Sequence, residues 1–334
     1  MMLILISLII LAVLLLLANV FYVFVAAADT QEYQIRAIGR RKYSYLAFGS
    51  TYCRYALDFD VVKADGYNLG YAAQFFYYTD LMVRSFARNA KPGAVIFIIC
   101  ADLAYAKVGK GEGGCFDYRK YIHFMDRVSL GDEYSVRRYI TDVLFPLIFH
   151  PSYWRMTLIA AAKCVLPRCI VQRTKNTRKS EKLTEEWMRQ LAHERCNSWC
   201  QQFGLKDVQS TEIPACVSEA FIKSSAIVAS TVQFCLDRGL RPILVATPWS
   251  PAMNELVGCD FMQTVYYDNI ERSNPQHVPF LDYSKEPRFQ DYSLFQTADL
   301  LNERGRKLFT EILISDIKKY TNYENWNFDI SSCS

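Results

Sequence analysis

The stretch "YLAFGSTYCRYALDF", residues 45–59, opens the folded part of the chain after an apolar N-terminus. Its apolar run Tyr45–Phe48 is followed by Gly49 and then by two hydroxyl residues, Ser50 and Thr51. A strand, a tight turn, a hydroxyl and a helix is the order in which several hydrolase families present a nucleophile. A hydroxyl here is also a good helix N-cap, because its oxygen accepts a hydrogen bond from a free backbone N–H. Residue types alone favour the cap.

Short apolar runs alternate with helical patterns along the rest of the chain. The run Ala94–Cys100 has the length and composition of a parallel strand that is covered on both faces. Further strands are predicted at Ile243–Ala246 and His277–Asp282, and helices at Ala72–Ala90, Ala220–Arg238 and Asn302–Tyr320. This alternation predicts an α/β fold with a mostly parallel sheet. Ligands bind such sheets at the carboxyl ends of the strands, where Gly49–Thr51, Cys100–Asp102 and Thr247–Trp249 would gather.

The first 28 residues contain no charged side chain and are long enough to cross a hydrocarbon core of about 30 Å as a helix. We predict a single-pass transmembrane anchor over 1–28 and a juxtamembrane linker over 29–43. A cleavable signal peptide is the rival interpretation, supported by Ala26–Ala28, but the apolar region is long and no basic segment precedes it. Arg36 and Arg40–Lys42 follow the helix, and the positive-inside rule would place the rest of the chain in the cytoplasm.

Composition argues against several other classes of protein. The net charge is only +4 and the basic residues are scattered, so no nucleic-acid-binding face is predicted. The eleven cysteines are an odd number, and Cys100, Cys164 and Cys235 lie in apolar runs typical of buried free thiols. Their spacing predicts neither a disulfide framework nor a metal site, and no cofactor is expected. Residues 180–194 carry mixed charges at helical spacing and are interpreted as a solvated helix.

Four stretches carry a resemblance to a known superfamily: "FGSTYCRYALD", "GYNLGYAAQFFYYTDLMV", "RPILVATPWSP" and "VPFLDYSKEPRFQDYSLFQTADLLNERGRKLFTEIL". In this order they resemble the SGNH/GDSL hydrolases, and most closely the membrane-anchored, DltD-like branch associated with envelope polysaccharides. The resemblance covers Ser44 to about Lys319 and is most specific in the last block. It implies a three-layer α/β/α sandwich, SGNH/flavodoxin-like, over 44–322. A helical insertion at about 103–215 matches little, and 323–334 is a C-terminal tail.

The resemblance implies a Ser nucleophile on the first block and an Asp-x-x-His pair on the last. With Gly49 aligned, the nucleophile position falls on Thr51, and Ser50 takes the neighbouring position. The His position falls on Leu300 and the Asp position on Thr297. Asp299 is the remaining candidate base, but a carboxylate is a far weaker base than a neutral imidazole at pH 7.

For the oxyanion and substrate, the resemblance points to Gly66 or Asn68 on the second block, and Asp102 and Thr247 lie near expected strand ends. The histidines, His123, His150, His193 and His277, all fall outside the matching positions. No Ser-His-Asp triad is therefore visible in the sequence.

Together these features predict a membrane-anchored pseudoenzyme, accessory to the assembly or acyl modification of a cell-envelope polysaccharide. One alternative is an active carbohydrate esterase or O-acyltransferase that uses Ser50 or Thr51. Another is an interaction module for a membrane acyltransferase or a polymer transporter. The expected partners are the polymer, the lipid membrane through 1–28, and such an acyltransferase. The resemblance places the domain outside the cytoplasmic membrane, against the charge rule, and we follow the resemblance.

Overall fold

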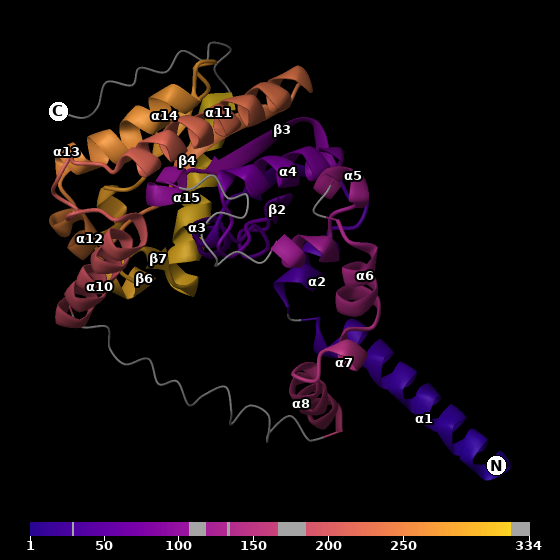
Figure 1. The fold of residues 1–334 in the computed structure, drawn as a ribbon. Coiled ribbons are helices and arrows are strands. Elements are labelled where there is room, and N and C mark those ends of the chain that lie inside the picture. The colour runs from indigo at the N-terminus through magenta and orange to yellow at the C-terminus, as the bar shows by residue number, and fades with distance from the viewer. Residues whose placement is uncertain (29, 107–117, 132–133, 166–184, 322–334) are drawn as a thin grey trace. The chain divides into compact units, whose positions relative to one another are not determined.

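The computed structural model describes residues 1–28, 30–106, 118–131, 134–165 and 185–321 (Figure 1). The chain forms two compact units, each built from two stretches of sequence. The first unit combines Met1–Gly39 with Asp117–Glu181, and the second combines Arg40–Phe116 with Lys182–Ser334.

The second unit is built on a parallel sheet of five strands in the order β2-β1-β3-β4-β5. The direction of strand addition reverses between β1 and β3, which makes a topological switch point at their carboxyl ends. The α/β class and the mostly parallel sheet are thereby confirmed. The strands are β1 (Tyr43–Phe48), β2 (Gly66–Asn68), β3 (Ala90–Ile99), β4 (Arg241–Ala246) and β5 (Phe280–Asp282).

Burial explains why these segments form the centre of the sheet. Leu46–Phe48 of β1, Phe97 and Ile98 of β3 and Ile243–Val245 of β4 have no measurable exposure to solvent. Side chains on successive strand residues point to opposite faces, so strands that are buried on both faces must be apolar without alternation.

The helices of the second unit pack around this sheet. Helix α11 contacts α4, α14 and β4, while α15 contacts α3 and β7, which pairs antiparallel with β6. The elements are α3 (Thr51–Ala56), α4 (Phe76–Phe86), α10 (Glu185–Phe203), α11 (Ala215–Asp237), α12 (Pro251–Leu256), α13 (Cys259–Met262), α14 (Asp268–Ser273), α15 (Glu303–Thr321), β6 (Phe295–Thr297) and β7 (Leu300–Leu301), with short helical turns between them.

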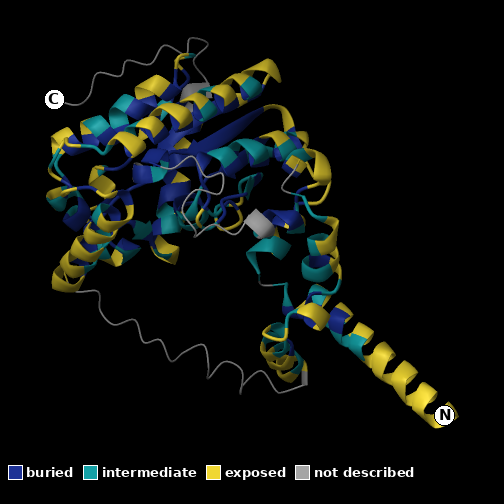
Figure 2. Ribbon diagram, in the orientation of Figure 1, coloured by how far each residue is buried: buried dark blue, intermediate teal, exposed yellow. Residues whose placement is uncertain are grey.

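The first unit is helical and contains the apolar N-terminus. Helix α1 (Met2–Phe21) continues into the π-helical turn η1 (Tyr22–Ala26), and Figure 2 shows α1 exposed over most of its length. Met2–Ala26 is long and apolar enough to span a membrane, as the sequence predicts. The other elements are α2 (Gln31–Arg36), η4 (Tyr118–His123), α5 (Arg127–Leu130), α6 (Val136–Arg138), η6 (Tyr139–Leu144), α7 (Pro146–Phe149) and α8 (Tyr153–Val165). Helix α11 passes the same test of length and hydropathy but packs within the second unit.

Three local predictions were wrong. The helix predicted over Ala72–Ala90 spans only Phe76–Phe86, and Ala90 already belongs to β3, because it pairs with Tyr43 across an irregularity in the ladder. Helix α10 is not fully solvated, since one stripe of its residues is buried. Cys164 is exposed, unlike Cys100 and Cys235.

Asp65, which precedes β2, forms hydrogen bonds with residues at the amino ends of β1 and β3. Its carboxylate accepts hydrogen bonds from Lys91 Nζ at 2.6 Å, from Ser44 Oγ at 2.8 Å and from the Ser44 N–H at 3.1 Å. The hydrogen bond from Lys91 is the largest cause that lowers the pKa of Asp65 from 3.8 to about 2.

This depressed pKa gives an expected acid response. Because the folded-state pKa lies below the unfolded value, the stabilisation is present above about pH 4 and is lost as the pH falls toward 2. We expect Asp65→Asn to make the melting temperature less dependent on pH in this window. The partners are partly exposed, so the effect stays under about 1 kcal/mol. Thermal unfolding of both proteins between pH 2 and 5 measures it, and parallel curves would contradict it.

Candidate functional site

A cavity of about 510 Å³ lies in the second unit at the carboxyl ends of β1 and β3. This is the switch point of the sheet, where open α/β folds bind ligands. Its lining comes from five places that are far apart in sequence: residues 50–52, residues 73–75, residues 101, 103 and 104, the inner face of α10, and residues 297, 299 and 300. The first and last blocks of the sequence resemblance therefore meet in one cavity.

Ser50 lines this cavity at the start of α3. It takes the N-cap position, but its side chain accepts no capping hydrogen bond. Its hydroxyl oxygen is buried and has no hydrogen-bond partner among the described residues. The capping interpretation, which the sequence favoured, is therefore wrong for Ser50.

The turn before Ser50 requires glycine. Gly49 has φ +150°, and an added Cβ would lie 2.9 Å from Cβ of Ile99 on the adjacent strand. A side chain at this position is excluded by both the backbone conformation and the close approach of β3. The turn thus holds the Ser50 hydroxyl at the end of β1 in one backbone geometry.

Thr51 also lines the cavity, but its hydroxyl is partnered. Its Oγ1 accepts a hydrogen bond from the backbone N–H of Ala73 at 3.3 Å. Ala73 has φ +52° and lies in the loop before α4. Thr51 therefore anchors the loop that forms one wall of the cavity.

Asp299 is buried at the rim of the same cavity and is fully engaged. Its Oδ2 accepts from the Tyr52 hydroxyl at 2.7 Å and lies 2.6 Å from Nε of Arg195. Its Oδ1 accepts from Thr297 Oγ1 at 2.9 Å. Arg195 also donates to the Tyr52 hydroxyl at 2.8 Å. The carboxylate thus holds the Arg195 guanidinium at the cavity wall.

Arg195 belongs to α10, a helix that the sequence analysis did not connect with the site. Its guanidinium lies 5.6 Å from the ring centroid of Trp199, within the range of cation–π attraction. The signal that could have placed α10 against the core is the helical spacing of its buried stripe. The stripe consists of Met188, Ala192, Cys196, Trp199 and Phe203.

Gly66 and Asn68 lie on β2 and do not line the cavity. Gly66 pairs with Tyr45, upstream of the strand end, and an added Cβ would lie 2.5 Å from the ring of Phe59. The side-chain amide of Asn68 donates to the carbonyl oxygens of Cys53 and Leu57 at 2.9 and 2.8 Å. Asn68 therefore joins β2 to α3 and its C-terminal end, and Gly66 packs against Phe59 in the segment that follows α3.

Thr247 and Asp102 follow β4 and β3 in sequence. Thr247 is buried and is not among the residues that line the cavity. Asp102 begins a short helical turn, and its side chain lies outside the described residues. The structure therefore brings together Ser50, Thr51 and Asp299 but adds no oxyanion donor from the predicted set.

None of the four histidines of the chain lines this cavity. His193 and His277 are exposed, and His123 and His150 belong to the first unit. Leu300, at the position where the resemblance expects histidine, does line it. Within the described ranges, no group of three or more His, Cys, Asp or Glu side chains is placed to hold a metal ion.

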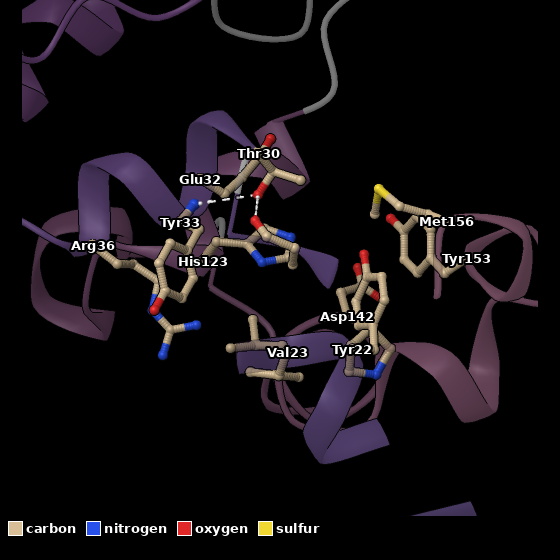
Figure 3. A pocket seen from close by; sticks show the side chains of 13 residues that line it. Tyr22, Val23, Thr30, Glu32, Tyr33, Arg36, His123, Asp142, Tyr153 and Met156 are labelled. Atoms are coloured by element: carbon tan, nitrogen blue, oxygen red, sulfur yellow. Dashed lines mark hydrogen bonds between the residues drawn. The ribbon is translucent and has the colours of Figure 1, made fainter. Parts of the chain in front are cut away.

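A second cavity, of about 220 Å³, lies within the first unit (Figure 3). It is lined by apolar residues of η1 and α8 and by the ionisable side chains of Glu32, Arg36, His123 and Asp142. Asp142 accepts a hydrogen bond from Thr141 and lies 2.8 Å from Nε2 of His150. This second cavity lacks a serine or threonine placed as Ser50 is. The cavity at the sheet is therefore the candidate functional site.

No protein-family model matches the chain, and no curated protein matches it significantly.

Proposed function

We propose that this protein is a membrane-anchored, SGNH-hydrolase-like protein that assists the assembly or acyl modification of a cell-envelope polysaccharide. Its catalytic centre is degenerate, and its folded domain is a three-layer α/β/α sandwich outside the cytoplasmic membrane. The strand order β2-β1-β3-β4-β5, which flavodoxin-like folds share, supports this proposal. So does the meeting of the first and last blocks at the switch point.

The observation that carries the proposal is the lining of the Ser50 cavity. Leu300 and Thr297 lie in it, where a hydrolase of this superfamily would have histidine and aspartate. A serine hydroxyl is a weak nucleophile unless an adjacent base accepts its proton. Asp299 is occupied by Tyr52, Arg195 and Thr297. Glu194, the other carboxylate of the described lining, accepts a hydrogen bond from Gln190, and no histidine lines the cavity.

The same lining suits the binding of a sugar unit. Phe75, Trp199 and Phe203 offer apolar surface, Gln202 and Ser50 offer hydrogen-bonding groups, and Arg195 offers a positive charge. A volume of about 510 Å³ lies in the range of small-molecule sites, which combine apolar walls with a few polar groups. In this proposal the cavity holds an acylated or anionic residue of the polymer without cleaving it.

One observation favours a second candidate, an active carbohydrate esterase or O-acyltransferase that uses Ser50. A buried hydroxyl without a hydrogen bond costs free energy, and Ser50 Oγ is in this state. A substrate group, or a base supplied by a membrane acyltransferase, would relieve that cost. The role of an interaction module for such a protein or for a polymer transporter remains a prediction.

A fluorophosphonate probe, which reacts only with activated serine or threonine hydroxyls, separates these candidates. We expect folded full-length protein in detergent to show no more labelling than Ser50→Ala or Thr51→Ala. Labelling that is lost in either variant would make the enzyme the leading candidate. A gain-of-function variant, Leu300→His with Thr297→Asp, is expected to acquire labelling that depends on Ser50 or Thr51.

A further inference from the structure

The apolar helix α1 contains one buried polar side chain, that of Asn19. Its amide nitrogen donates to the carbonyl oxygen of Leu144 at 2.8 Å. Its amide oxygen accepts from the backbone N–H of Leu147 at 3.1 Å. These two hydrogen bonds join α1 to the junction between η6 and α7.

This junction is a break in helical structure. Phe145 has φ −127° and ψ 46°, outside the helical region, and Pro146 has no N–H. A break of this kind leaves backbone groups without their usual partners, which is very costly in hydrocarbon. Asn19 supplies partners for two of them, so it allows a non-helical backbone beside an apolar helix.

The depth of Asn19 follows from the length of the apolar run. A hydrocarbon core of about 30 Å takes about 20 helical residues at 1.5 Å each. Every 20-residue window within Met2–Ala26 contains Asn19, roughly 3 to 10 Å from the C-terminal boundary of that window. When α1 spans a membrane, the junction bonded to Asn19 lies at the same depth in the bilayer as Asn19.

The elements around this junction expose apolar side chains. Helix α8 packs on η1, where the ring of Tyr153 stacks on Tyr22 at a centroid distance of 5.0 Å. Figure 2 shows exposed residues along α7 and α8, beside the end of α1. Five large apolar residues here are between 41% and 64% exposed: Leu144, Ile148, Phe149, Leu158 and Ile159.

The cavity in Figure 3 marks where this apolar surface ends. Val23 and Met156 line it together with Thr30, Glu32 and Arg36, so apolar and charged side chains meet there. Tyr22 and Tyr153 lie at the same place, as aromatic residues do at membrane–water boundaries. The charged side chains would face the headgroups, and α7 and α8 would extend toward the acyl chains.

We propose that α7 and α8, with the end of η6, form a membrane-embedded helical hairpin whose exposed apolar face contacts phospholipid acyl chains. The protein then contacts the acyl chains through the exposed apolar residues of α7 and α8 as well as through α1, while the exposed Arg155 and Lys163 of α8 extend toward the headgroups. This contact explains the buried asparagine in the apolar helix and the exposed apolar residues beside it. It does not depend on the function proposed for the Ser50 cavity.

Photo-crosslinking in vesicles tests the proposal on the full-length chain. The photoreactive analogue p-benzoylphenylalanine replaces Phe149 or Leu158, and the protein is reconstituted in phosphatidylcholine–phosphatidylglycerol vesicles and irradiated. The control position is Val128 in α5, which is 92% exposed in the same unit but lies away from α1 (Figure 1). We expect phospholipid adducts, seen by intact mass, at least about fivefold above the control. Covalent dimers in place of lipid adducts, or adducts equal to the control, would overturn the proposal.

Hydrogen exchange tests separately whether Asn19 protects the junction between η6 and α7. In vesicles, Asn19→Leu is expected to raise the exchange rate of the Leu147 amide about tenfold, the effect of losing roughly 1.4 kcal/mol of protection. Ser7→Leu is the control, because the Ser7 hydroxyl bonds only within α1 and is exposed. Unchanged exchange at Leu147 would contradict the assigned depth of the junction.

Discussion

Arg195→Ala is expected to lower the free energy of unfolding of the second unit by about 3 kcal/mol. Asp299 is only 4% exposed, and without Arg195 its charge would stay buried with two hydroxyl donors, Tyr52 and Thr297. Removing one partner of a buried ion pair costs more than the pair itself contributes, because the other charge is left without compensation. Since Arg195 is partly exposed, the expected loss lies at the lower end of the usual range.

Denaturant unfolding followed by tryptophan fluorescence measures this loss, because Trp199 and Trp249 lie close together near Arg195. Arg189→Ala is the matched control on the same helix. Its ion pairs with Glu185 and Glu255 are solvent-exposed, so no measurable change in the free energy of unfolding is expected. Equal losses in the two variants would show that Asp299 does not depend on Arg195.

Gly305→Ala is expected to destabilise the second unit by about 3 kcal/mol, near the upper end for overpacking in a core. Gly305 lies in the first turn of α15, where an added Cβ would overlap the carbonyl oxygen of Leu294 and come within 3.0 Å of Leu301 Cδ2. The obstacle is backbone and cannot rotate away. The same carbonyl accepts the N–H of Asn302, so a shift would also disturb the start of the helix.

Whether Gly305→Ala raises or lowers the free energy of unfolding distinguishes an open helix position from a closely packed one. In an open helix, replacing glycine with alanine stabilises by up to about 1 kcal/mol. Gly239→Ala is the control, because Gly239 has φ +66° but nothing lies within 4 Å of an added Cβ. We expect it to cost about 1 to 2 kcal/mol through its backbone conformation alone. A stabilised Gly305→Ala protein would contradict the close packing of α15 against the loop before β6.

The centre of the fold could be predicted from the sequence because strands buried on both faces appear as continuous apolar runs. Tyr45–Phe48, Ala94–Cys100 and Ile243–Ala246 all form strands. The edge strand β2 could not be predicted in this way, since Gly66–Asn68 contains no apolar run. The start of β3 was not predicted, because residues 90–93 contain no continuous apolar run, whereas pairing of Ala90 with Tyr43 extends the strand.

The candidate site was predicted in part. The sequence order of strand, glycine and hydroxyl located Ser50 at a strand end, and the missing capping hydrogen bond then showed that its hydroxyl is not a cap. The role of Arg195 could not be read from its neighbours, because its partner Asp299 lies far along the chain and only the tertiary fold joins them. Asn68 was a candidate oxyanion donor by alignment, but hydrogen bonds to α3 occupy its amide.

We propose that Ser50 lies in a binding cavity without an activating base. The most direct test is the intact mass of full-length wild-type protein after prolonged treatment with excess fluorophosphonate, beside Ser50→Ala. We expect the wild-type protein to keep its unmodified mass, as the variant does, in samples whose unfolding transition shows that they are folded. One phosphonyl group per wild-type chain, absent from Ser50→Ala, would contradict the claim and identify Ser50 as a live nucleophile.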